Sequence, residues 1–156
     1  MQDTGVVRAG WAQTAASTDA GARDLLGILL TNHRELTEAA AGQTHQLRAL
    51  LLRGDSGDRH FGRSGLSRGV LSTLAHRNPP SGATEKQTAR HAEIRRVAEV
   101  VIAYRNELCA NRNQMATIVE ELAPGMTAQA GMGPFKAATA ILDAALLDGP
   151  HPANSR

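Results

Sequence analysis

An unbroken heptad repeat constrains the fold of this chain more than any other feature of its sequence. Ile94, Val101, Leu108, Met115 and Leu122 recur every seven residues. Apolar residues at this spacing return to one side of an α-helix after two turns and form a narrow seam for another helix to pack against. The repeat therefore predicts a long amphipathic helix.

Local signals predict that this helix covers residues 84–123. Thr84 and Gln87 have the spacing of a capping box, and Pro124 with Gly125 ends the helix. Between these signals the predicted seam consists of Ile94, Val97, Val101, Tyr104, Leu108, Asn111, Met115, Ile118 and Leu122.

A second long helix is predicted over residues 18–53. Thr18 suits the N-cap position, and Gly54 stops the pattern. Its seam consists of Leu26, Leu29, His33, Leu36, Ala40, Gln43, Leu47 and Leu50. The chain has only one Trp, one Tyr and two Phe, so it has few large side chains for a globular core, which also favours long helices with narrow seams.

We therefore expect an all-α fold in which the two long helices form an antiparallel coiled-coil hairpin. The seams could equally pair with a second chain, because heptads do not distinguish pairing within a chain from pairing between chains. Asn111 lies in the second seam. A buried Asn there would fix the register of the helices, but we favour a partly exposed Asn at a splayed position.

The remaining segments are shorter. Residues 1–17 lack a sustained period, and we expect them to form a poorly ordered arm. Residues 54–65 are rich in turn-forming residues, which predicts a loop, and a short helix is predicted over residues 66–77. Residues 124–147 contain a glycine hairpin and a final helix, and residues 148–156 are expected to be a disordered tail.

The glycine hairpin is the first candidate binding site. Gly131 and Gly133 flank one apolar residue, so the backbone there can turn tightly and approach a partner closely. Pro134 suits the first turn of the next helix, whose exposed N–H groups, with Lys136 nearby, would hold a phosphate. This pattern is typical of the helix-hairpin-helix motif, which grips the nucleic-acid backbone. An ordinary glycine turn that caps a helix is the alternative.

Positive charge is concentrated in the middle of the chain. Residues 45–96 carry ten basic and four acidic side chains, although the formal net charge of the whole chain is only +2. Clustered positive charge can neutralise phosphates, so this segment is a second candidate patch, with a merely solvated face as the alternative. Its candidate residues are Arg59, Arg63, Arg68, Arg90, Arg95 and Arg96.

No catalytic arrangement is recognisable in the sequence. The six histidines are scattered and Cys109 is the only cysteine, so we expect no metal site, no cofactor and no internal disulfide. No segment has the pattern of a signal peptide or a membrane span, so we expect no membrane partner and a cytoplasmic location.

Five segments, taken in order, resemble one transposase family. They are LLGILLTNHRELT at residues 25–37, HAEIRR at 91–96, NRNQM at 111–115, ELAPG at 121–125 and the glycine hairpin at 131–134. The resemblance covers about residues 22–142. It is to the central coiled-coil region and the start of the C-terminal domain of the DEDD insertion-sequence transposases of the one-ten and one-sixteen type, which recombine DNA with a guide RNA.

The resemblance implies binding of DNA, or of structured guide RNA, in bacterial DNA transposition or recombination. Members of the family have a nuclease-like domain that binds divalent metal through four acidic residues, and a nucleophilic serine in the C-terminal domain. This chain matches neither region, so we expect a truncated protein that has no catalytic residues and is inactive alone. We also expect this protein to self-associate as a homodimer or to pair with full-length transposase. The alternatives are a helical oligomerisation module without nucleic-acid activity and an inhibitor that pairs with full-length transposase.

Overall fold

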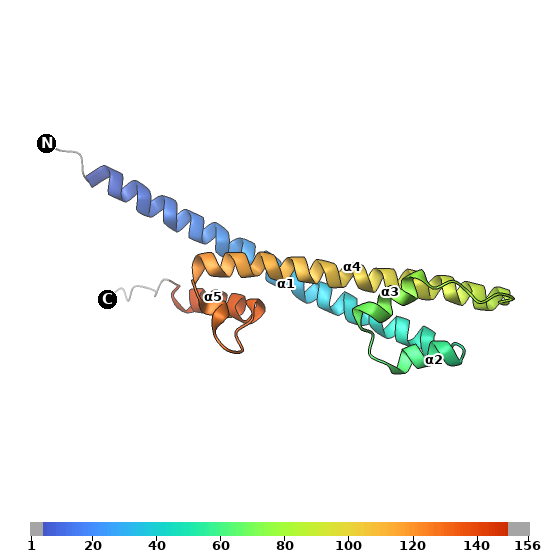
Figure 1. Ribbon diagram of the computed structural model, residues 1–156. Helices are drawn as coiled ribbons and strands as arrows, with labels where there is room; N and C mark the ends of the chain where they lie inside the picture. Colours follow the sequence, from blue (N-terminus) through green and yellow to red (C-terminus); the bar gives the residue numbers. More distant parts are fainter. Residues whose placement is uncertain (1–4, 150–156) are drawn as a thin grey trace, which may run out of the picture. The chain divides into compact units, whose positions relative to one another are not determined.

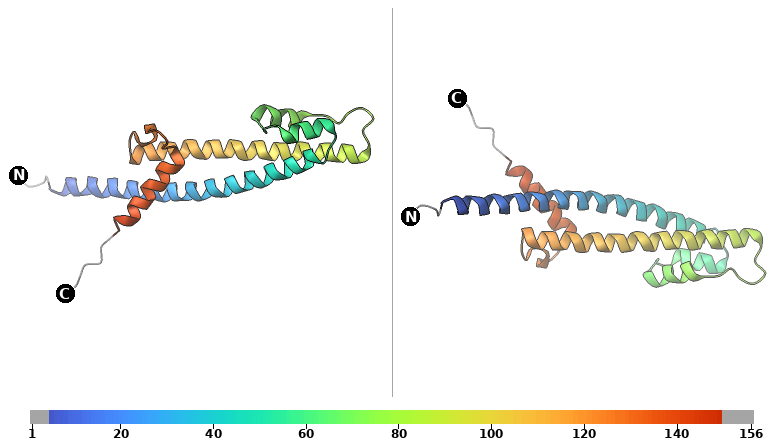
Figure 2. Two further views of the ribbon diagram at one scale, coloured as in Figure 1. Left: turned by 90° about the horizontal axis from the view of Figure 1, so that it is seen from below. Right: turned by 90° about the horizontal axis from the view of Figure 1, so that it is seen from above.

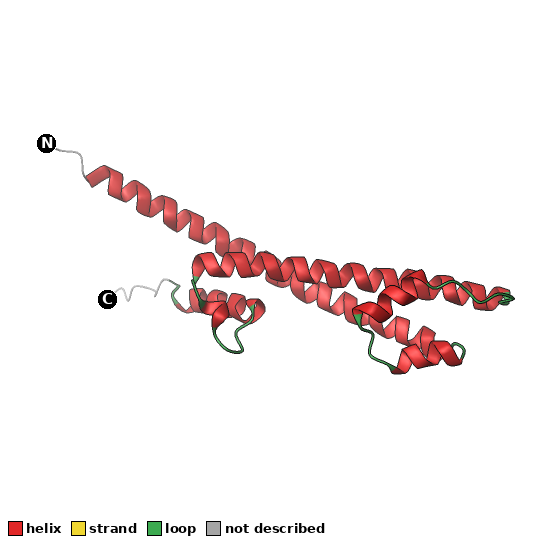
Figure 3. Ribbon diagram, viewed as in Figure 1, coloured by secondary structure: helices red, strands yellow, loops and turns green. Residues whose placement is uncertain are grey.

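The described part of the chain consists of helices joined by loops and turns. The computed structural model describes the backbone of residues 5–149 and the side chains of residues 18–149. Its elements are α1 (Gly5–Leu52), α2 (Ser56–Arg63), α3 (Arg68–His76), α4 (Glu85–Leu122), the 3-10 helix η1 (Met126–Ala128) and α5 (Pro134–Leu147) (Figure 1). No strand occurs in these residues, so the all-α prediction is confirmed (Figure 3). None of the described helices combines the length and the apolar character needed to cross a membrane.

The first helix begins earlier than predicted. α1 starts at Gly5 rather than near Thr18, so the helix includes residues 5–17, which we expected to precede it. This segment has several alanines and no proline, and its alanines favour a helix more than its Gly, Ser and Thr residues oppose it. Residues 1–4 and 150–156 lie outside the described residues, so most of the predicted tail does too.

The segment predicted to be a loop, residues 54–65, contains α2. Asp55 caps this helix, because its Oδ1 accepts a hydrogen bond of 2.9 Å from the Asp58 N–H. Gly62 is buried against α1, where an added Cβ would lie 3.1 Å from Leu52 Cδ2 and 3.2 Å from Leu51 Cβ. Gly62 is typical of a turn in sequence, but in the structure its lack of a side chain allows α2 to pack closely on α1.

The other helices lie close to their predicted positions. The capping box at the start of α4 is confirmed: Gln87 N–H donates to Thr84 Oγ1 at 3.2 Å, and Thr84 N–H donates to Gln87 Oε1 at 2.8 Å. α3 begins after an N-cap at Ser67, whose Oγ accepts from the Val70 N–H. α5 begins with Pro134 in its first turn, as predicted.

The chain forms two compact units, and each contains a stretch of α1 and a stretch of α4. Unit 1 comprises Met1–His33 and Ala110–Arg156, and unit 2 comprises Arg34–Cys109. Both boundaries between the units fall inside continuous helices rather than in loops.

Each unit has its own apolar core, built from three or more elements. In unit 2 the core consists of Leu47 and Leu51 from α1, Leu66 from the loop, Leu71, Leu74 and Ala75 from α3, and Ile94, Val97, Ala98 and Val101 from α4. In unit 1 it consists of Leu26, Leu29 and Leu30 from α1, Met115, Ile118 and Val119 from α4, and Ala137 and Ala138 from α5. The two alanines are fully buried, and their small side chains let α5 pack against the α1 and α4 residues of this core. In both views of Figure 2, α5 crosses α1.

The helices bury a wider face than a coiled-coil seam. Every residue of the two predicted seams is buried or half-buried. However, Leu30, Leu51, Ala98 and Val119, each four residues after a seam residue, are also buried. A third helix covers this second stripe, α5 in unit 1 and α3 in unit 2. The prediction of a narrow two-helix seam was therefore wrong on this point.

The polar residues of the two seams bond to one another in unit 1. His33 is 8% exposed and its Nδ1 donates to Asn111 Oδ1 at 3.1 Å, while Asn111 Nδ2 donates to the Leu29 carbonyl at 3.0 Å. Asn111 is 4% exposed, so the splayed position that we favoured was wrong. The Phe135 ring of α5 lies 5.0 Å from the His33 ring, so residues of α1, α4 and α5 meet at this polar pair.

Candidate nucleic-acid interface

The predicted glycine hairpin follows the end of α4 in unit 1. The chain turns at Gly125, which has a φ of 77°, and the Glu120 carboxylate accepts from the Gly125 N–H at 3.1 and 3.2 Å. The short helix η1 follows, and then the chain turns again at Gly131. The element before this second turn is therefore one 3-10 turn instead of the α-helix that a complete helix-hairpin-helix motif has.

The two glycines of the hairpin have different roles in the backbone. Gly131 has a φ of 77°, a conformation that favours glycine, so the turn itself requires this residue. Gly133 has φ −74° and ψ 168°, which any residue can adopt, and an added Cβ would meet no atom within 4 Å. The fold does not require glycine at position 133, and the space beside its Cα is open to a partner.

The start of α5 presents unsatisfied backbone donors. Gly133 is the N-cap and offers no side-chain hydrogen bond, and the first helical bond runs from the Ala137 N–H to the Gly133 carbonyl at 3.0 Å. The N–H groups of Phe135 and Lys136 have no hydrogen-bond acceptor among the described residues. Lys136 is exposed in the same turn. These are the features that allow a helix N-terminus to hold a phosphate.

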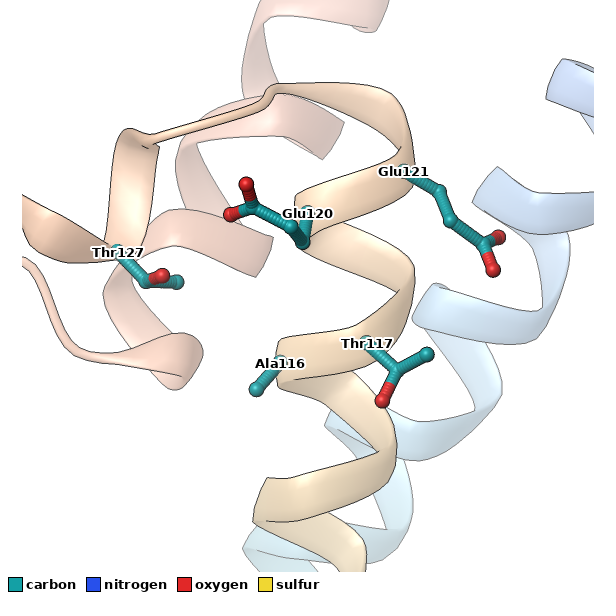
Figure 4. A pocket seen from close by; sticks show the side chains of 5 residues that line it. All are labelled: Ala116, Thr117, Glu120, Glu121 and Thr127. Carbon is teal, nitrogen blue, oxygen red and sulfur yellow. The ribbon is translucent and has the colours of Figure 1, made fainter.

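The surroundings of the hairpin are acidic. The described side chains of unit 1 include three basic residues, Arg23, Arg112 and Lys136, but six acidic ones. An open pocket of about 550 Å³ is lined by Ala116, Thr117, Glu120, Glu121 and Thr127. Figure 4 shows Glu120 directed toward the η1 segment and Glu121 directed toward α1. Lys136 therefore lacks the basic neighbours that would strengthen phosphate binding.

Unit 2 carries the positive charge, with twelve Lys and Arg residues and eight Asp and Glu residues. Arg59 and Arg63 are exposed on α2, and Arg90 is half-buried on α4. Within the described part of the chain, the side chains of these three residues form no hydrogen bond or ion pair. They are available to an anionic partner.

The other three predicted arginines have partners within unit 2. Arg68 donates to Asn106 Oδ1 at 3.1 Å. Arg95 donates through Nη2 to the Arg77 carbonyl at 3.0 Å and to Asn78 Oδ1 at 2.9 Å, so it holds the turn after α3. Arg96 is exposed and pairs with Glu93 at 2.6 Å.

The Arg96–Glu93 pair shifts the pKa of both side chains in the direction that keeps them charged. The hydrogen bond from Arg96 lowers the pKa of the Glu93 carboxyl below its ordinary value, and Glu93 in turn raises the pKa of Arg96. Both groups are therefore charged at neutral pH, and the pair adds no net charge to the surface.

Sequence reasoning missed one polar cluster, which is also in unit 2. Asp55, Asp58 and His91 each present a ligand atom within 4.8 Å of the others, and Arg77 Nη1 donates to Asp58 Oδ1 at 2.6 Å. The Asp58 N–H lowers the pKa of the Asp55 carboxyl, and Arg77, the Gly57 N–H and His91 lower it further. The cluster has no paired His or Cys residues, and its one signal in the sequence is Asp55 with Asp58 at N-cap spacing.

Comparison of the chain with protein-family models, curated proteins and solved structures finds no match.

Proposed function

We propose that this chain binds the phosphate backbone of DNA or structured RNA in the bacterial cytoplasm, in the DNA transposition or recombination of a transposase family. The observation that carries the proposal is the start of α5. There an uncapped helix N-terminus, an exposed Lys136 and the open space beside Gly133 lie within one turn of the chain. Backbone donors at such a terminus bind phosphate without reading base sequence.

The two units contribute differently to this binding. Because unit 1 is acidic, the hairpin supplies a few short-range hydrogen bonds and little long-range attraction. The exposed arginines Arg59 and Arg63 of unit 2, with Arg90, supply the charge that neutralises phosphates. The arginines should therefore supply the larger, salt-dependent share of the affinity, and the hairpin a smaller share through its short-range hydrogen bonds.

A finer arrangement of the helices belongs to the same proposal. We infer that α1 and α4 run antiparallel as a hairpin, with α3 and α5 each covering one stretch of it. The burial of all predicted seam residues supports this inference, as does the Asn111 bond to the α1 backbone.

Fluorescence anisotropy of the full chain with labelled duplex DNA and structured RNA, at low and moderate salt, tests the function. We expect affinity to fall as salt rises, because binding releases counterions from the phosphates. Removing the charges of Arg59 and Arg63 by Arg→Gln changes should reduce the log–log salt slope by about two, since each phosphate contact contributes about 0.9.

The Gly133→Ala variant isolates the hairpin. Alanine fits the backbone there, so the variant should fold normally. The added Cβ would occupy the space proposed for the phosphate and should cost one hydrogen bond between the phosphate and the α5 N-terminus. We therefore expect binding about two- to tenfold weaker. Gly42→Ala in α1 is the matched control, because an added Cβ there also meets no atom within 4 Å. Equal affinity of Gly133→Ala and Gly42→Ala would remove the hairpin from the interface, and a folded wild type that binds neither nucleic acid would overturn the proposal.

The second candidate function is a helical module that associates with itself or with full-length transposase. It is favoured by large apolar side chains on the surface of unit 1: Ile28 is 66% exposed on α1, and Leu146 and Leu147 are 82% and 87% exposed on α5. Sedimentation analysis of Ile28→Gln beside the wild type tests it. A dimeric wild type and a monomeric Ile28→Gln variant would support the self-associating module. A monomeric wild type would exclude self-association.

A further inference from the structure

The cluster of Asp55, Asp58 and His91 joins two helices of unit 2. Asp55 is the N-cap of α2, Asp58 lies in the first turn of that helix, and His91 comes from α4. Asp58 is 1% exposed and His91 is 5% exposed, while Asp55 lies at the surface. Two carboxylates and an imidazole therefore meet at the edge of the core, with one side open to solvent.

The imidazole of His91 is the unexplained group in this cluster. It is more than nine-tenths buried, yet its ring nitrogens make no hydrogen bond with any described residue. Among the described residues, the side-chain atoms that are fully buried without a hydrogen-bond partner are Gln43 Oε1 and Arg95 Nε, so the ring nitrogens of His91 keep some contact with solvent and are accessible to an ion. A ring nitrogen lies within 4.8 Å of an oxygen of each carboxylate, so the ring is directed at the two acidic groups.

The two carboxylates also retain free ligand atoms. Asp55 Oδ1 accepts from the Asp58 N–H, and Asp58 Oδ1 accepts from Arg77. The Asp58 Oδ2 atom accepts no hydrogen bond from the described residues, whereas the Asp55 carboxylate also interacts with the Gly57 N–H. Gly54 leaves room for the Asp58 carboxylate, because any side chain at position 54 would collide with it.

We propose that Asp55, Asp58 and His91 bind one divalent transition-metal ion of the Zn²⁺ type, which ties α2 to α4. One imidazole and two carboxylates suit such an ion, whereas Ca²⁺ requires six to eight oxygen ligands. Ligand bonds of about 2.0–2.2 Å require the three atoms to move closer together, and the exposed Asp55 carboxylate can present its Oδ2 atom to the ion while Oδ1 keeps the cap bond to the Asp58 N–H. Water would occupy the fourth position.

Arg77 would act as an outer partner of this site. Its bond to Asp58 Oδ1 orients the carboxylate and leaves Oδ2 for the ion, as outer-shell groups do in other metal sites. Its positive charge also lowers the affinity for a cation, so binding should be weaker than at an all-cysteine zinc site.

The role that follows from this position is structural. α2 has only eight residues, and Gly57 and Gly62 within it disfavour helix. A metal bond from its N-terminal end to α4 would hold this helix in place. Bound Zn²⁺ should therefore slow amide hydrogen exchange in residues 56–63 more than elsewhere in the chain.

The test is a titration of the full-length chain with Zn²⁺ in competition with a coloured chelator, together with hydrogen exchange. The main variant is His91→Leu, which removes one ligand and breaks no hydrogen bond. Asp55→Asn is the second variant, because Asn still caps a helix but loses the carboxylate. We expect one Zn²⁺ per wild-type chain, and affinity reduced by more than about a hundredfold in His91→Leu, beyond the usual cost of losing an outer-shell partner.

His76→Ala and Cys109→Ser serve as controls, since both residues are exposed, lie outside the cluster and have side chains of a type that can bind zinc. Their affinity for Zn²⁺ should equal that of the wild type. Binding that survives in both His91→Leu and Asp55→Asn, or is lost in either control, would place the ion elsewhere and overturn the proposal. No saturable binding by the wild type in the micromolar range would overturn it as well.

Discussion

The buried bond between His33 and Asn111 should behave as a coupled pair when either partner is replaced. Leucine is similar in size to both side chains, so Asn111→Leu and His33→Leu remove polar atoms while leaving only a small cavity. Each single change leaves the other partner buried without this hydrogen bond, at 8% exposure for His33 and 4% for Asn111. The double change removes both groups together.

The expected magnitudes follow from the bonds. Asn111→Leu loses two hydrogen bonds, each worth about 0.5–1.5 kcal/mol net, and one of them is the buried bond that His33 Nδ1 donates. We expect the free energy of unfolding to fall by about 2–4 kcal/mol. His33→Leu should cost at least about 1 kcal/mol and the double change no more than about 1 kcal/mol, so the coupling energy should be at least about 2 kcal/mol.

Urea unfolding followed by circular dichroism measures these values, with hydrogen exchange in residues 134–147 reporting on unit 1. Asn113→Leu is the control, because Asn113 is exposed on the same helix and should change stability by less than about 0.5 kcal/mol. Single-variant losses that simply add in the double variant would refute the coupling. An Asn111→Leu variant as stable as the control would refute the burial argument itself.

Two further predictions concern unit 2. Thr84→Ala breaks the capping box of α4 and should lower stability by about 1 kcal/mol, as measured by urea unfolding, whereas Thr84→Ser should keep most of it. Leu71→Ala opens a cavity at a fully buried position and should lower the free energy of unfolding by about 2–5 kcal/mol. Leu52→Ala, at a position that is 44% exposed, should lower it far less. Equal losses in thermal or urea unfolding would contradict the assignment of the core.

The sequence predicted the position of a helix where the helix itself contains a heptad repeat, a capping box or an N-terminal proline. The heptads and the capping box located α4, and Pro134 located the start of α5, because periodicity and capping depend on residues that are neighbours along the chain. The sequence did not reveal that α3 and α5 would cover a second stripe of the long helices. A period describes which face is apolar, but it does not identify the helix that covers that face.

The candidate sites were predictable only in part. The hairpin has the expected turn at Gly131 and the expected helix start at Pro134. Arg95 was indistinguishable from Arg96 in sequence, yet Arg95 bonds to the turn after α3. Likewise, the approach of His91 to Asp58 depends on the packing of α2. This helix was not predicted, because its glycines are typical of a loop.

The division of the chain inside α1 and α4 restricts how the length of these helices can change. α1 supplies Leu26 and Leu30 to one core and Leu47 and Leu51 to the other, with no loop between them. Inserting a single residue between these sets would rotate one set by about 100° around the helix axis and turn it away from its core. Insertions and deletions should therefore accumulate in the loop at residues 78–83, while both long helices keep a fixed number of residues between their two cores.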